Sequence, residues 1–518
     1  MNARRSPLLL VLSLPLVREL QVAVRGRDYV AIRGLEDEVV LKGRHLLGGE
    51  WRAGRESFLT RSPSDLNEIV GEYPKGGPAD VAEALEAARK ALPGWRALNV
   101  QRRCDLLHRA GDLLASRATE IGTLLAREEG KRLSEAVGEA TRGAQVFHYY
   151  AGEVIRHPGQ FQDSLRDGHS VLVSYEPVGV ISLITPWNFP IAIPAWKVAG
   201  ALAYGNTCVL KPSEFAPGCA VLLGQLLEEA GLPPGVFNLV HGTGRELGDT
   251  LVSGADGVSF TGSTATGRLI LQQAAASMTK VQLELGGKNP LIVLDDADLQ
   301  VAVDVALQGT YGQTGQRCTG SERLIVTRGI HDEFADLLVK KVAALRVGHA
   351  LDADTEIGPV ATAAQLAKNL AFIESAKAEG AELATGGQQL ERRAPGHYLA
   401  PALFFGTTPS MQLNRSETFG PIAGIIRVQD LEEAIAVAND CELALSSGIC
   451  TTNIRSAERF RRLSKAGMVM INAPTAGVEY HVPFGGRAPS GYGAREQGTA
   501  SADFFTEVKT CYLNHGAI

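Results

Sequence analysis

The sequence has no paired or clustered cysteines, no basic stripe and no apolar run long enough to cross a bilayer. Its seven cysteines are scattered, without a CxxC motif or the Cys/His spacing of a metal site. An odd, dispersed set of this kind favours a reducing compartment and argues against a disulfide framework and a zinc centre. A formal net charge of -6 without clustered Lys and Arg makes nucleic acid and anionic membranes unexpected partners. We therefore expect a cytoplasmic protein without a bound metal.

One apolar stretch near the N-terminus, Leu8–Leu14, imitates a signal peptide because Arg4 and Arg5 precede it. The stretch is too short to span a membrane, and no small-x-small cleavage site follows it. We expect residues 1–45 to be an atypical N-terminal extension, with an upstream mis-start or export as alternatives.

The length and composition indicate a globular protein of two or three domains. A chain of 518 residues is too long for one hydrophobic core. With 45% apolar and 21% charged residues it has the composition of a soluble enzyme or binding protein. Neither an internal repeat nor a low-complexity segment is evident.

Hydrophobic periodicity predicts helices first and an alternating α/β pattern later. A hairpin at 46–51 precedes a helix over 80–95, which Asp80 would cap and Pro93-Gly94 would end, and further helical regions at 101–129 and 134–150. Apolar runs separated by amphipathic helices then predict a parallel, doubly wound sheet, buried on both faces. These runs are 178–184, 207–211, 236–240 and 257–260. A second α/β series spans 290–472, and 506–513 reads as a returning strand.

Two short motifs place an acid and a thiol in Gly-rich surroundings. Glu284 lies within Leu283-Glu284-Leu285-Gly286-Gly287, and Cys318 lies within Gly315-Gln316-Arg317-Cys318-Thr319. As general base and nucleophile they would form an enzyme that works through a covalent thioester. Considered alone, a surface carboxylate and a small buried thiol are the commoner interpretation.

Four loops after predicted strands offer ligand-binding groups, since ligands bind at the carboxyl ends of parallel strands. Asn188, between two prolines, could donate to an oxyanion or bond its own turn. Lys211 and Glu214 could hold a phosphate and a ribose diol, or form a solvated pair. Ser263 begins a helix whose amides could bind a pyrophosphate. The glycines Gly244 and Gly248 approximate GxGxxG with one residue too many, which is a weak signal.

Five motifs in order resemble the NAD(P)-dependent aldehyde dehydrogenase superfamily. The resemblance runs from about Leu46 to the C-terminus, nearly the whole chain. The motifs are Pro186-Trp187-Asn188-Phe189-Pro190, Phe260-Thr261-Gly262-Ser263, the Glu284 motif, the Cys318 motif and Glu417-Thr418-Phe419-Gly420-Pro421.

This resemblance implies a Rossmann-like cofactor domain, an α/β catalytic domain and a small β oligomerisation arm in a homodimer or homotetramer. The expected boundaries are 46–165 and 181–285 for the NAD-binding domain, 286–485 for the catalytic domain, and 166–180 with 486–518 for the arm and C-terminal tail.

The resemblance also implies roles for individual residues. Cys318 would attack the aldehyde, Asn188 would hold the oxyanion, and Glu284 would activate water. Lys197 and Glu496 match a proton-relay pair. The implied cofactor-binding residues are Thr185, Pro186, Trp187, Lys211, Ser213, Glu214, Gly244, Gly248, Phe260, Gly262, Ser263, Gly286, Glu417 and Phe419.

Glu214 bears on the choice of cofactor because a carboxylate that accepts the ribose 2'-hydroxyl would repel the 2'-phosphate of NADP. NAD is therefore expected first, and Ser213 beside it leaves NADP possible.

Within the superfamily, the segments 476–486 and 492–498 resemble bacterial 2-oxoglutarate semialdehyde (2,5-dioxopentanoate) dehydrogenases. Arg142, seven residues before Tyr149, falls where relatives that take apolar aldehydes carry a hydrophobic tunnel residue. A guanidinium there suits an aldehyde that ends in a carboxylate, although an exposed helix Arg is the plain alternative. The remaining substrate candidates are Phe189, Trp196, Arg317 and Phe484.

Other functions remain possible on these grounds. The substrate could be succinate semialdehyde, aminoadipate semialdehyde or a broad range of aldehydes. A non-catalytic scaffold would be free to lose Cys318 and Glu284, and both are present. An acylating enzyme that passes its thioester to coenzyme A would have no use for a water-activating Glu284.

Overall fold

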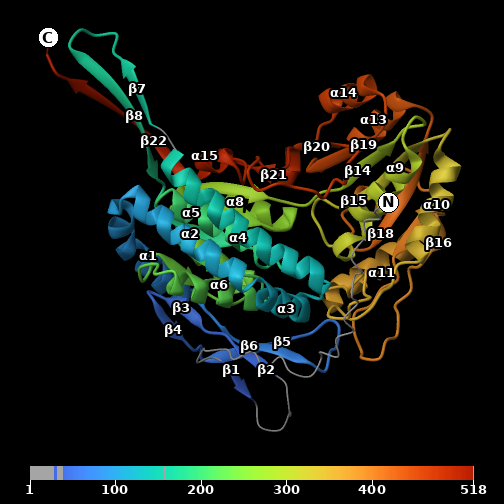
Figure 1. Ribbon diagram of the computed structural model, residues 1–518, viewed down its shortest axis with the longest axis horizontal. Coiled ribbons are helices and arrows are strands. Elements are labelled where there is room, and N and C mark those ends of the chain that lie inside the picture. The colour runs from blue at the N-terminus through green and yellow to red at the C-terminus, as the bar shows by residue number, and fades with distance from the viewer. Residues whose placement is uncertain (1–28, 32–38, 157–158, 517–518) are drawn as a thin grey trace, which may run out of the picture.

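The computed structural model describes residues 29–31, 39–156 and 159–516, and it has two α/β bodies side by side (Figure 1). Each body is built on its own parallel sheet, and a thin β arm projects from the first body beside the C-terminus. The predicted α/β class is confirmed. The apolar stretch Leu8–Leu14 lies outside the described residues.

The first body contains an eight-stranded sheet in the order β21-β13-β12-β9-β10-β11-β3-β4. The five strands from β13 to β11 are parallel, as predicted for β9, β10, β11 and β12, whereas β13 was not predicted. The strands β21, β3 and β4 are antiparallel additions at the two edges. The bounds are β3 (His45–Leu47), β4 (Glu50–Arg52), β9 (Val180–Ile184), β10 (Thr207–Lys211), β11 (Phe237–Leu239), β12 (Gly257–Thr261), β13 (Lys280–Glu284) and β21 (Gly491–Tyr492).

Helices cover both faces of this sheet because its strands are apolar on both sides. Ile181 and Leu183 of β9 belong to the core under one helical layer, and Val180 and Ile184 belong to the core under the other. The first layer comprises α2 (Val100–Ser116), α3 (Ala118–Glu129), α4 (Leu133–Arg156), α5 (Ala192–Ala203) and α6 (Gly218–Glu229). The second comprises α1 (Pro78–Ala97), α7 (Gly244–Ser253) and α8 (Thr264–Ser277).

The second body contains a seven-stranded sheet in the order β16-β17-β18-β15-β14-β19-β20, parallel except at β16. Its strands are β14 (Asn289–Val293), β15 (Ser321–Thr327), β16 (Glu382–Thr385), β17 (Ala402–Phe405), β18 (Ile422–Val428), β19 (Ser446–Cys450) and β20 (Met468–Ile471). Its helices are α9 (Leu299–Tyr311), α10 (His331–Ala343), α11 (Ala363–Ala378), α12 (Gln412–Arg415), α13 (Leu431–Asn439) and α14 (Ile454–Leu463).

Two smaller sheets complete the molecule. The arm pairs β22 (Thr506–Asn514), β8 (His169–Pro177) and β7 (Gln160–Asp163) in antiparallel order, after the short α15 (Ala502–Phe505). A four-stranded sheet joins β1 (Tyr29–Ala31), β2 (Val39–Lys42), β6 (Ile69–Lys75) and β5 (Glu56–Arg61). The predicted boundary after residue 45 therefore falls within β3, and the predicted division into domains remains a prediction.

Several local predictions are wrong. The helix over 80–95 begins at Pro78 with Gly77 as N-cap, and it continues past Pro93 to Ala97 because Trp95 is buried in the core and its indole donates to Leu202 O at 3.3 Å. Asp80 instead accepts a hydrogen bond from the Gly77 amide at 2.8 Å. The region 101–129 is two helices, separated at Arg117, whose backbone is not helical.

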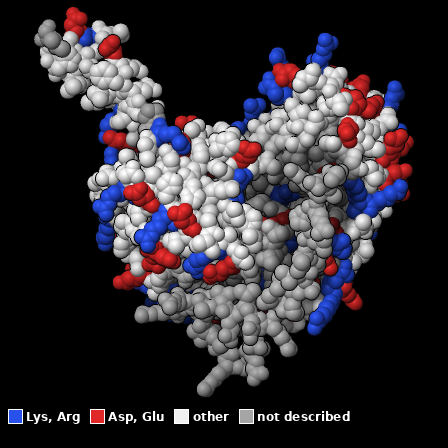
Figure 2. Space-filling view, viewed as in Figure 1, with Lys and Arg blue, Asp and Glu red and all other residues white. Residues whose placement is uncertain are grey.

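Among the described residues no helix is long and apolar enough to cross a membrane. In the same residues no group of three or more His, Cys, Asp or Glu side chains is arranged to hold a metal ion. Figure 2 shows acidic and basic side chains intermixed over the coloured part of one face.

Candidate active site

Cys318 lies in a tight turn between the short 3-10 helix η1 (Gly312–Gly315) and β15, with its side chain half-buried. Asn289 holds this turn, because its amide donates to Cys318 O at 2.8 Å and to Gly320 O at 2.9 Å. Thr475 Oγ1 also donates to Thr319 O at 2.7 Å. The backbone around the thiol is thus fixed by side chains from two other segments.

The surroundings of Cys318 favour the neutral thiol. Burial raises the pKa of Cys318 to about 12, and the nearby carboxylates of Glu417 and Glu284 act in the same direction. Since the thiolate is the nucleophilic form, the thiol must lose its proton as it attacks an electrophile.

Asn188 brings the first body to the Cys318 turn. Its Nδ2 donates to Gln316 O at 3.0 Å, two residues before the cysteine, and the side chain is buried. A carboxamide has two N–H hydrogens, and this bond uses one of them. The predicted turn geometry, in which Asn188 would bond its own backbone, is not the one that the structure has.

Glu284 is the last residue of β13 and is buried near Gly485 and Gly486. Its Oε2 accepts a long hydrogen bond from the Gly486 amide at 3.4 Å. A side chain on Gly485, whose φ is +150°, would lie 2.4 Å from Glu284 Oε1. Burial raises the pKa of Glu284 well above its usual range, and Glu496 raises it further against the opposing effects of Lys197 and Arg495.

The predicted relay pair, Lys197 and Glu496, is in direct contact inside the first body. Lys197 Nζ donates to Glu496 Oε1 and, at 2.7 Å, to Ser259 Oγ. Ser259 in turn is 2.8 Å from Gln282 Oε1, and all four side chains are buried. Glu496 Oε2 has no hydrogen-bond partner among the described residues. The network therefore lies beside Glu284 and retains one acceptor for a further proton donor.

Polar groups at the carboxyl ends of β9, β10 and β12 fit a dinucleotide. Lys211 Nζ is buried and lies 3.4 Å from Glu214 Oε2, while the half-buried Glu214 remains accessible. Thr185 and Thr261 have buried hydroxyl groups without a partner among the described residues. Ser263 caps α8, so the first amides of this helix face the same edge.

The glycines predicted to bind the cofactor differ in their surroundings. Gly244 begins α7 and Gly248 follows one turn later, and at neither position would a Cβ atom meet another group within 4 Å. A Cβ atom on Gly262 would lie 2.5 Å from the ring of Phe260. The space beside α7 is thus open, and the turn after β12 is closed by its own phenylalanine. Pro186 and Ser213 lie in the loops that follow β9 and β10.

Glu417 and Phe419 lie beside the Glu284 motif. Glu417 Oε1 accepts a hydrogen bond from the Gly287 amide at 2.9 Å, and a Cβ atom on Gly286 would lie 2.8 Å from Glu417 Oε2. Phe419 has a left-handed φ of +55° and contacts Trp187 edge-to-face, with ring centroids 5.4 Å apart. Burial raises the pKa of Glu417 to about 7, with a further contribution from Glu322.

The predicted substrate residues do not form one cluster, because Arg142 and the pair of Trp196 and Phe484 contact different groups. Arg142 is half-buried on α4, lies 5.2 Å from the Tyr480 ring centroid and donates to Val478 O. It is therefore not the exposed helix Arg of the alternative interpretation. Trp196 and Phe484 are buried with ring centroids 5.7 Å apart.

Arg317 instead bonds Gln308 O of α9, and none of its contacts joins it to Arg142. Arg142 is thus the better placed of the two predicted guanidinium groups, since its neighbours Val478 and Tyr480 come from the segment 476–486.

Sequence patterns did not reveal four residues that position these groups. They are Lys131, Glu139, Asn289 and Glu322, of which Glu322 accepts from the amides of Thr418 and Phe419 at 2.9 Å each. A polar or charged residue inside or next to a motif, such as Asn289 after the Glu284 motif, is the signal that could have indicated them.

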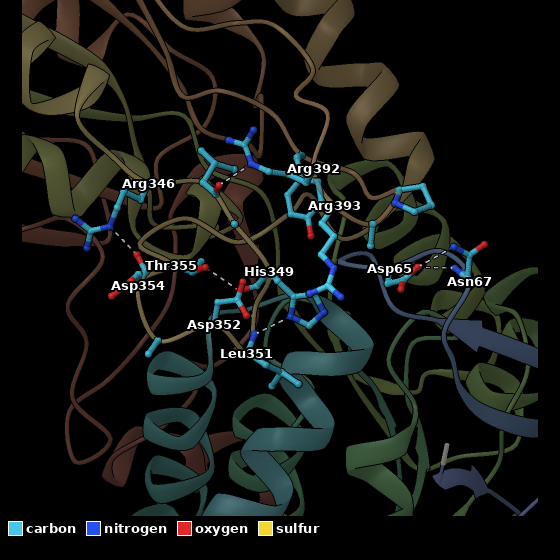
Figure 3. A pocket seen from close by; sticks show the side chains of 16 residues that line it. Asp65, Asn67, Arg346, His349, Leu351, Asp352, Asp354, Thr355, Arg392 and Arg393 are labelled. Carbon is cyan, nitrogen blue, oxygen red and sulfur yellow. Dashed lines mark hydrogen bonds between the residues drawn. The ribbon is translucent and has the colours of Figure 1, made fainter. Parts of the chain in front are cut away.

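A cavity of about 840 Å³ lies elsewhere, in the segments 65–67, 346–355 and 392–398 (Figure 3). Its lining includes Arg346, Arg392 and Arg393 as well as Asp65, Asp352 and Asp354, so the opposite charges balance. It contains none of the predicted site residues, and we place the candidate active site at Cys318 instead.

Comparison with known proteins identifies the family of the chain. The model of the aldehyde dehydrogenase family matches residues 51–511. The chain belongs to the aldehyde dehydrogenase family. It is therefore an oxidoreductase that acts on small aldehydes, and the resemblance read from the motifs is confirmed.

Curated relatives of this aldehyde dehydrogenase cover nearly its whole length. An alpha-ketoglutaric semialdehyde dehydrogenase from Bacillus subtilis is 42% identical over 476 residues, covering 90% of this chain and 97% of that protein. A 2,5-dioxopentanoate dehydrogenase from Saccharolobus solfataricus is 37% identical over 478 residues, covering 91% of this chain and 99% of that protein.

Solved structures agree on the fold. An NAD-dependent aldehyde dehydrogenase from Sinorhizobium meliloti superposes with a TM-score of 0.90 at 35% identity, over 92% of this chain and 95% of that one. A betaine aldehyde dehydrogenase from Staphylococcus aureus in complex with NAD+ has a TM-score of 0.89 at 33% identity, with the same coverage.

Proposed function

We propose that this dehydrogenase oxidises 2-oxoglutarate semialdehyde (2,5-dioxopentanoate) to 2-oxoglutarate, with NAD as hydride acceptor and Cys318 as nucleophile. The observation that carries the chemistry is the hydrogen bond from Asn188 Nδ2 to Gln316 O, which sets an amide donor from one body beside the thiol of the other. The substrate rests on the names of the curated relatives and on the position of Arg142.

The reaction begins when the Cys318 sulfur attacks the aldehyde carbon and the thiol transfers its proton to water. Asn188 Nδ2 and the Cys318 amide stabilise the oxyanion of the thiohemiacetal. When bound, NAD supplies the acceptor for the hydride that the thiohemiacetal loses, and the acyl group remains on Cys318 as a thioester.

Glu284 then takes a proton from the water that attacks the thioester, and the carboxylate product leaves as the Cys318 thiol is restored. The Glu284 carboxyl group lies beside Gly486, and the charges of Lys197 and Glu496 act on its pKa. Lys197 and Glu496 are therefore suited to accept the proton from Glu284 afterwards. A raised pKa makes Glu284 a stronger base once it is deprotonated.

The cofactor site is assigned to the strand ends of the first body. Lys211 and Glu214 would hold the adenosine ribose, Ser263 and Trp187 the pyrophosphate, and Glu417 the nicotinamide ribose. The unpartnered hydroxyl groups of Thr185 and Thr261 and the open space at Gly244 and Gly248 fit this assignment.

Replacing Glu214 by Gln should shift the cofactor preference. The amide keeps an acceptor oxygen for the ribose 2'-hydroxyl but removes the negative charge, which would repel a 2'-phosphate and which pairs with Lys211 at 3.4 Å. We expect the ratio of kcat/KM for NADP to that for NAD to rise about 10-fold, equivalent to ~1.4 kcal/mol. Initial rates with both cofactors measure this. The control is Glu229→Gln, an exposed glutamate at the end of α6. An unchanged ratio would place the ribose elsewhere.

Replacing Arg142 by Met tests the substrate. If the guanidinium binds the distal carboxylate, kcat/KM for 2-oxoglutarate semialdehyde and succinate semialdehyde should fall about 10- to 100-fold, mainly through KM. The rate with short uncharged aldehydes should stay the same or rise. The assay follows reduced cofactor over a panel of aldehydes and identifies the product as a carboxylate or a coenzyme A thioester.

Arg156→Met is the matched control for this panel, since Arg156 lies on the same helix but is largely exposed. If uncharged aldehydes are the better substrates of the unmodified enzyme, the assignment to a semialdehyde carboxylate is wrong.

The arm supports a homodimer or homotetramer. It projects from the first body, and Phe161, Val508 and Tyr512 expose about two thirds of their surface, 67%, 63% and 66%. Apolar residues gathered on a thin projecting sheet favour burial against another subunit.

A cytoplasmic location, which the dispersed free cysteines favour, remains a prediction.

A further inference from the structure

We propose that the buried ion pair of Lys131 and Glu139 positions the loop that carries Asn188, so that both are positioning residues of the oxyanion hole. Lys131 lies in the loop between α3 and α4, and Glu139 lies in the second turn of α4. The inference rests on the proposed oxyanion role of Asn188 and assigns a role to two residues outside the motifs.

Lys131 contacts the Asn188 loop directly. Its Nζ donates to Asn188 O at 2.7 Å and to Glu139 Oε2 at 2.5 Å, and it lies 4.2 Å from the ring centroid of Phe189. The side chains of Lys131 and Glu139 are 1% and 2% exposed. Because water is excluded, a lost donor would leave Asn188 O and the Glu139 carboxylate without their partner.

Glu139 holds the other end of the same loop. Its Oε1 accepts hydrogen bonds from the amides of Ile191 and Ala192, at 3.0 Å each, where α5 begins. The pair therefore binds three backbone atoms within five residues, and the Asn188 side chain extends from this fixed segment to Gln316 O.

The local charges favour the ammonium form of Lys131. Burial alone would lower the pKa of Lys131, but the carboxylates of Glu139 and Glu129 together raise it above its usual value. Glu129 also accepts from the Lys131 amide at 2.9 Å, which fixes the backbone that presents the ammonium group. A buried ion pair adds little net stability compared with apolar residues of similar volume, so positioning is the better account of its presence.

Helix α4 connects the two ends of the proposed substrate site. Glu139 and Arg142 are three residues apart and lie on neighbouring positions of the helix surface. Glu139 fixes the oxyanion loop and Arg142 faces Tyr480, so one rigid helix would set the distance between the reacting carbonyl and a distal carboxylate.

The test is a double-mutant cycle of Lys131→Met and Asn188→Ala. We expect Lys131→Met to lower kcat about 10- to 100-fold with the KM for NAD unchanged, because a displaced donor loses most of its effect on the oxyanion. In the Asn188→Ala background, the same substitution should lower kcat less than about 2-fold, because the group it positions is already gone.

A second measurement separates positioning from general damage. Alkylation of Cys318 by iodoacetamide forms no oxyanion, so its rate should equal that of the unmodified enzyme in Lys131→Met. Lys90→Met, on the exposed face of α1, is the control and should leave all rates unchanged. If Lys131→Met does not fold, Glu139→Gln takes its place, since it keeps the volume and an acceptor for the Ile191 amide.

The outcomes are distinct. Equal losses of kcat in both backgrounds, a slowed alkylation, or no loss at all would overturn the positioning role. If Asn188→Ala itself has no effect on kcat, the proposed oxyanion hole is wrong, and that failure is seen before Lys131 is changed.

Discussion

Replacing Cys318 by alanine is expected to lower kcat for aldehyde oxidation by about four to six orders of magnitude, the scale on which removing a covalent nucleophile acts. The thiol provides the sulfur of both covalent intermediates, and a methyl group cannot form either of them. Absorbance of the reduced cofactor with a semialdehyde substrate measures the loss. Binding of NAD should be retained, because the assigned cofactor groups lie on other strands.

The chain offers matched controls for this substitution. Cys441→Ala changes a half-buried thiol in the same body, and Cys511→Ala changes an exposed thiol in the arm. Both variants should keep the full rate. If Cys318→Ala oxidises aldehydes at the unmodified rate, the reaction does not pass through a thioester on this residue.

Much of the fold follows from apolar runs in the sequence. The strands β9, β10 and β12 are fully buried apolar segments, and their parallel order was predicted from the helices between them. The predictions failed for β13 and β19, which lack such runs. In β13, Lys280, Gln282 and Glu284 alternate with apolar residues. Gln282 and Glu284 are buried and Lys280 is half-buried, and their polar partners, such as Ser259 for Gln282 and Thr506 O for Lys280, come from other segments of the chain.

The strand β19 shows why local pattern was insufficient. Its sequence, Ser446-Ser447-Gly448-Ile449-Cys450, has small residues because β19 packs closely against its surroundings. A Cβ atom on Gly448 would lie 2.9 Å from Leu291 and 3.0 Å from Thr475. Such closeness depends on tertiary neighbours, which a window along the chain does not contain.

The residues of the candidate site likewise divide into those that the sequence predicted and those that it did not. Cys318, Glu284 and Asn188 lie in ordered motifs and could be predicted, whereas Lys131 reads as an ordinary lysine after Gly130, which ends α3. Its burial arises only when α4 and the loop of Asn188, which is 57 residues from Lys131 along the chain, pack around it. Residues that position a site are harder to predict because their partners are distant in sequence.

Replacing Glu284 by Gln should separate the two halves of the reaction. Acylation does not require a base for water, so the first turnover should release about one equivalent of reduced cofactor for each Cys318. Steady-state kcat should then fall about 10²- to 10⁴-fold, because hydrolysis of the thioester without a general base becomes the slow step. Rapid mixing of the variant with NAD and substrate measures both phases, and Glu374→Gln, an exposed glutamate of α11, should leave both unchanged.

The direction in which steady-state kcat changes with pH follows from the pKa of Glu284. Burial holds the pKa of Glu284 well above its usual range, so the carboxyl group is protonated at low pH and becomes a base only as pH rises through that raised pKa. Steady-state kcat of the unmodified enzyme should therefore increase with pH, and this increase should be lost in Glu284→Gln. If the variant shows no burst, acylation itself is impaired. Glu284 would then act before the thioester forms, as the base that removes the proton from Cys318, whose pKa burial raises to about 12.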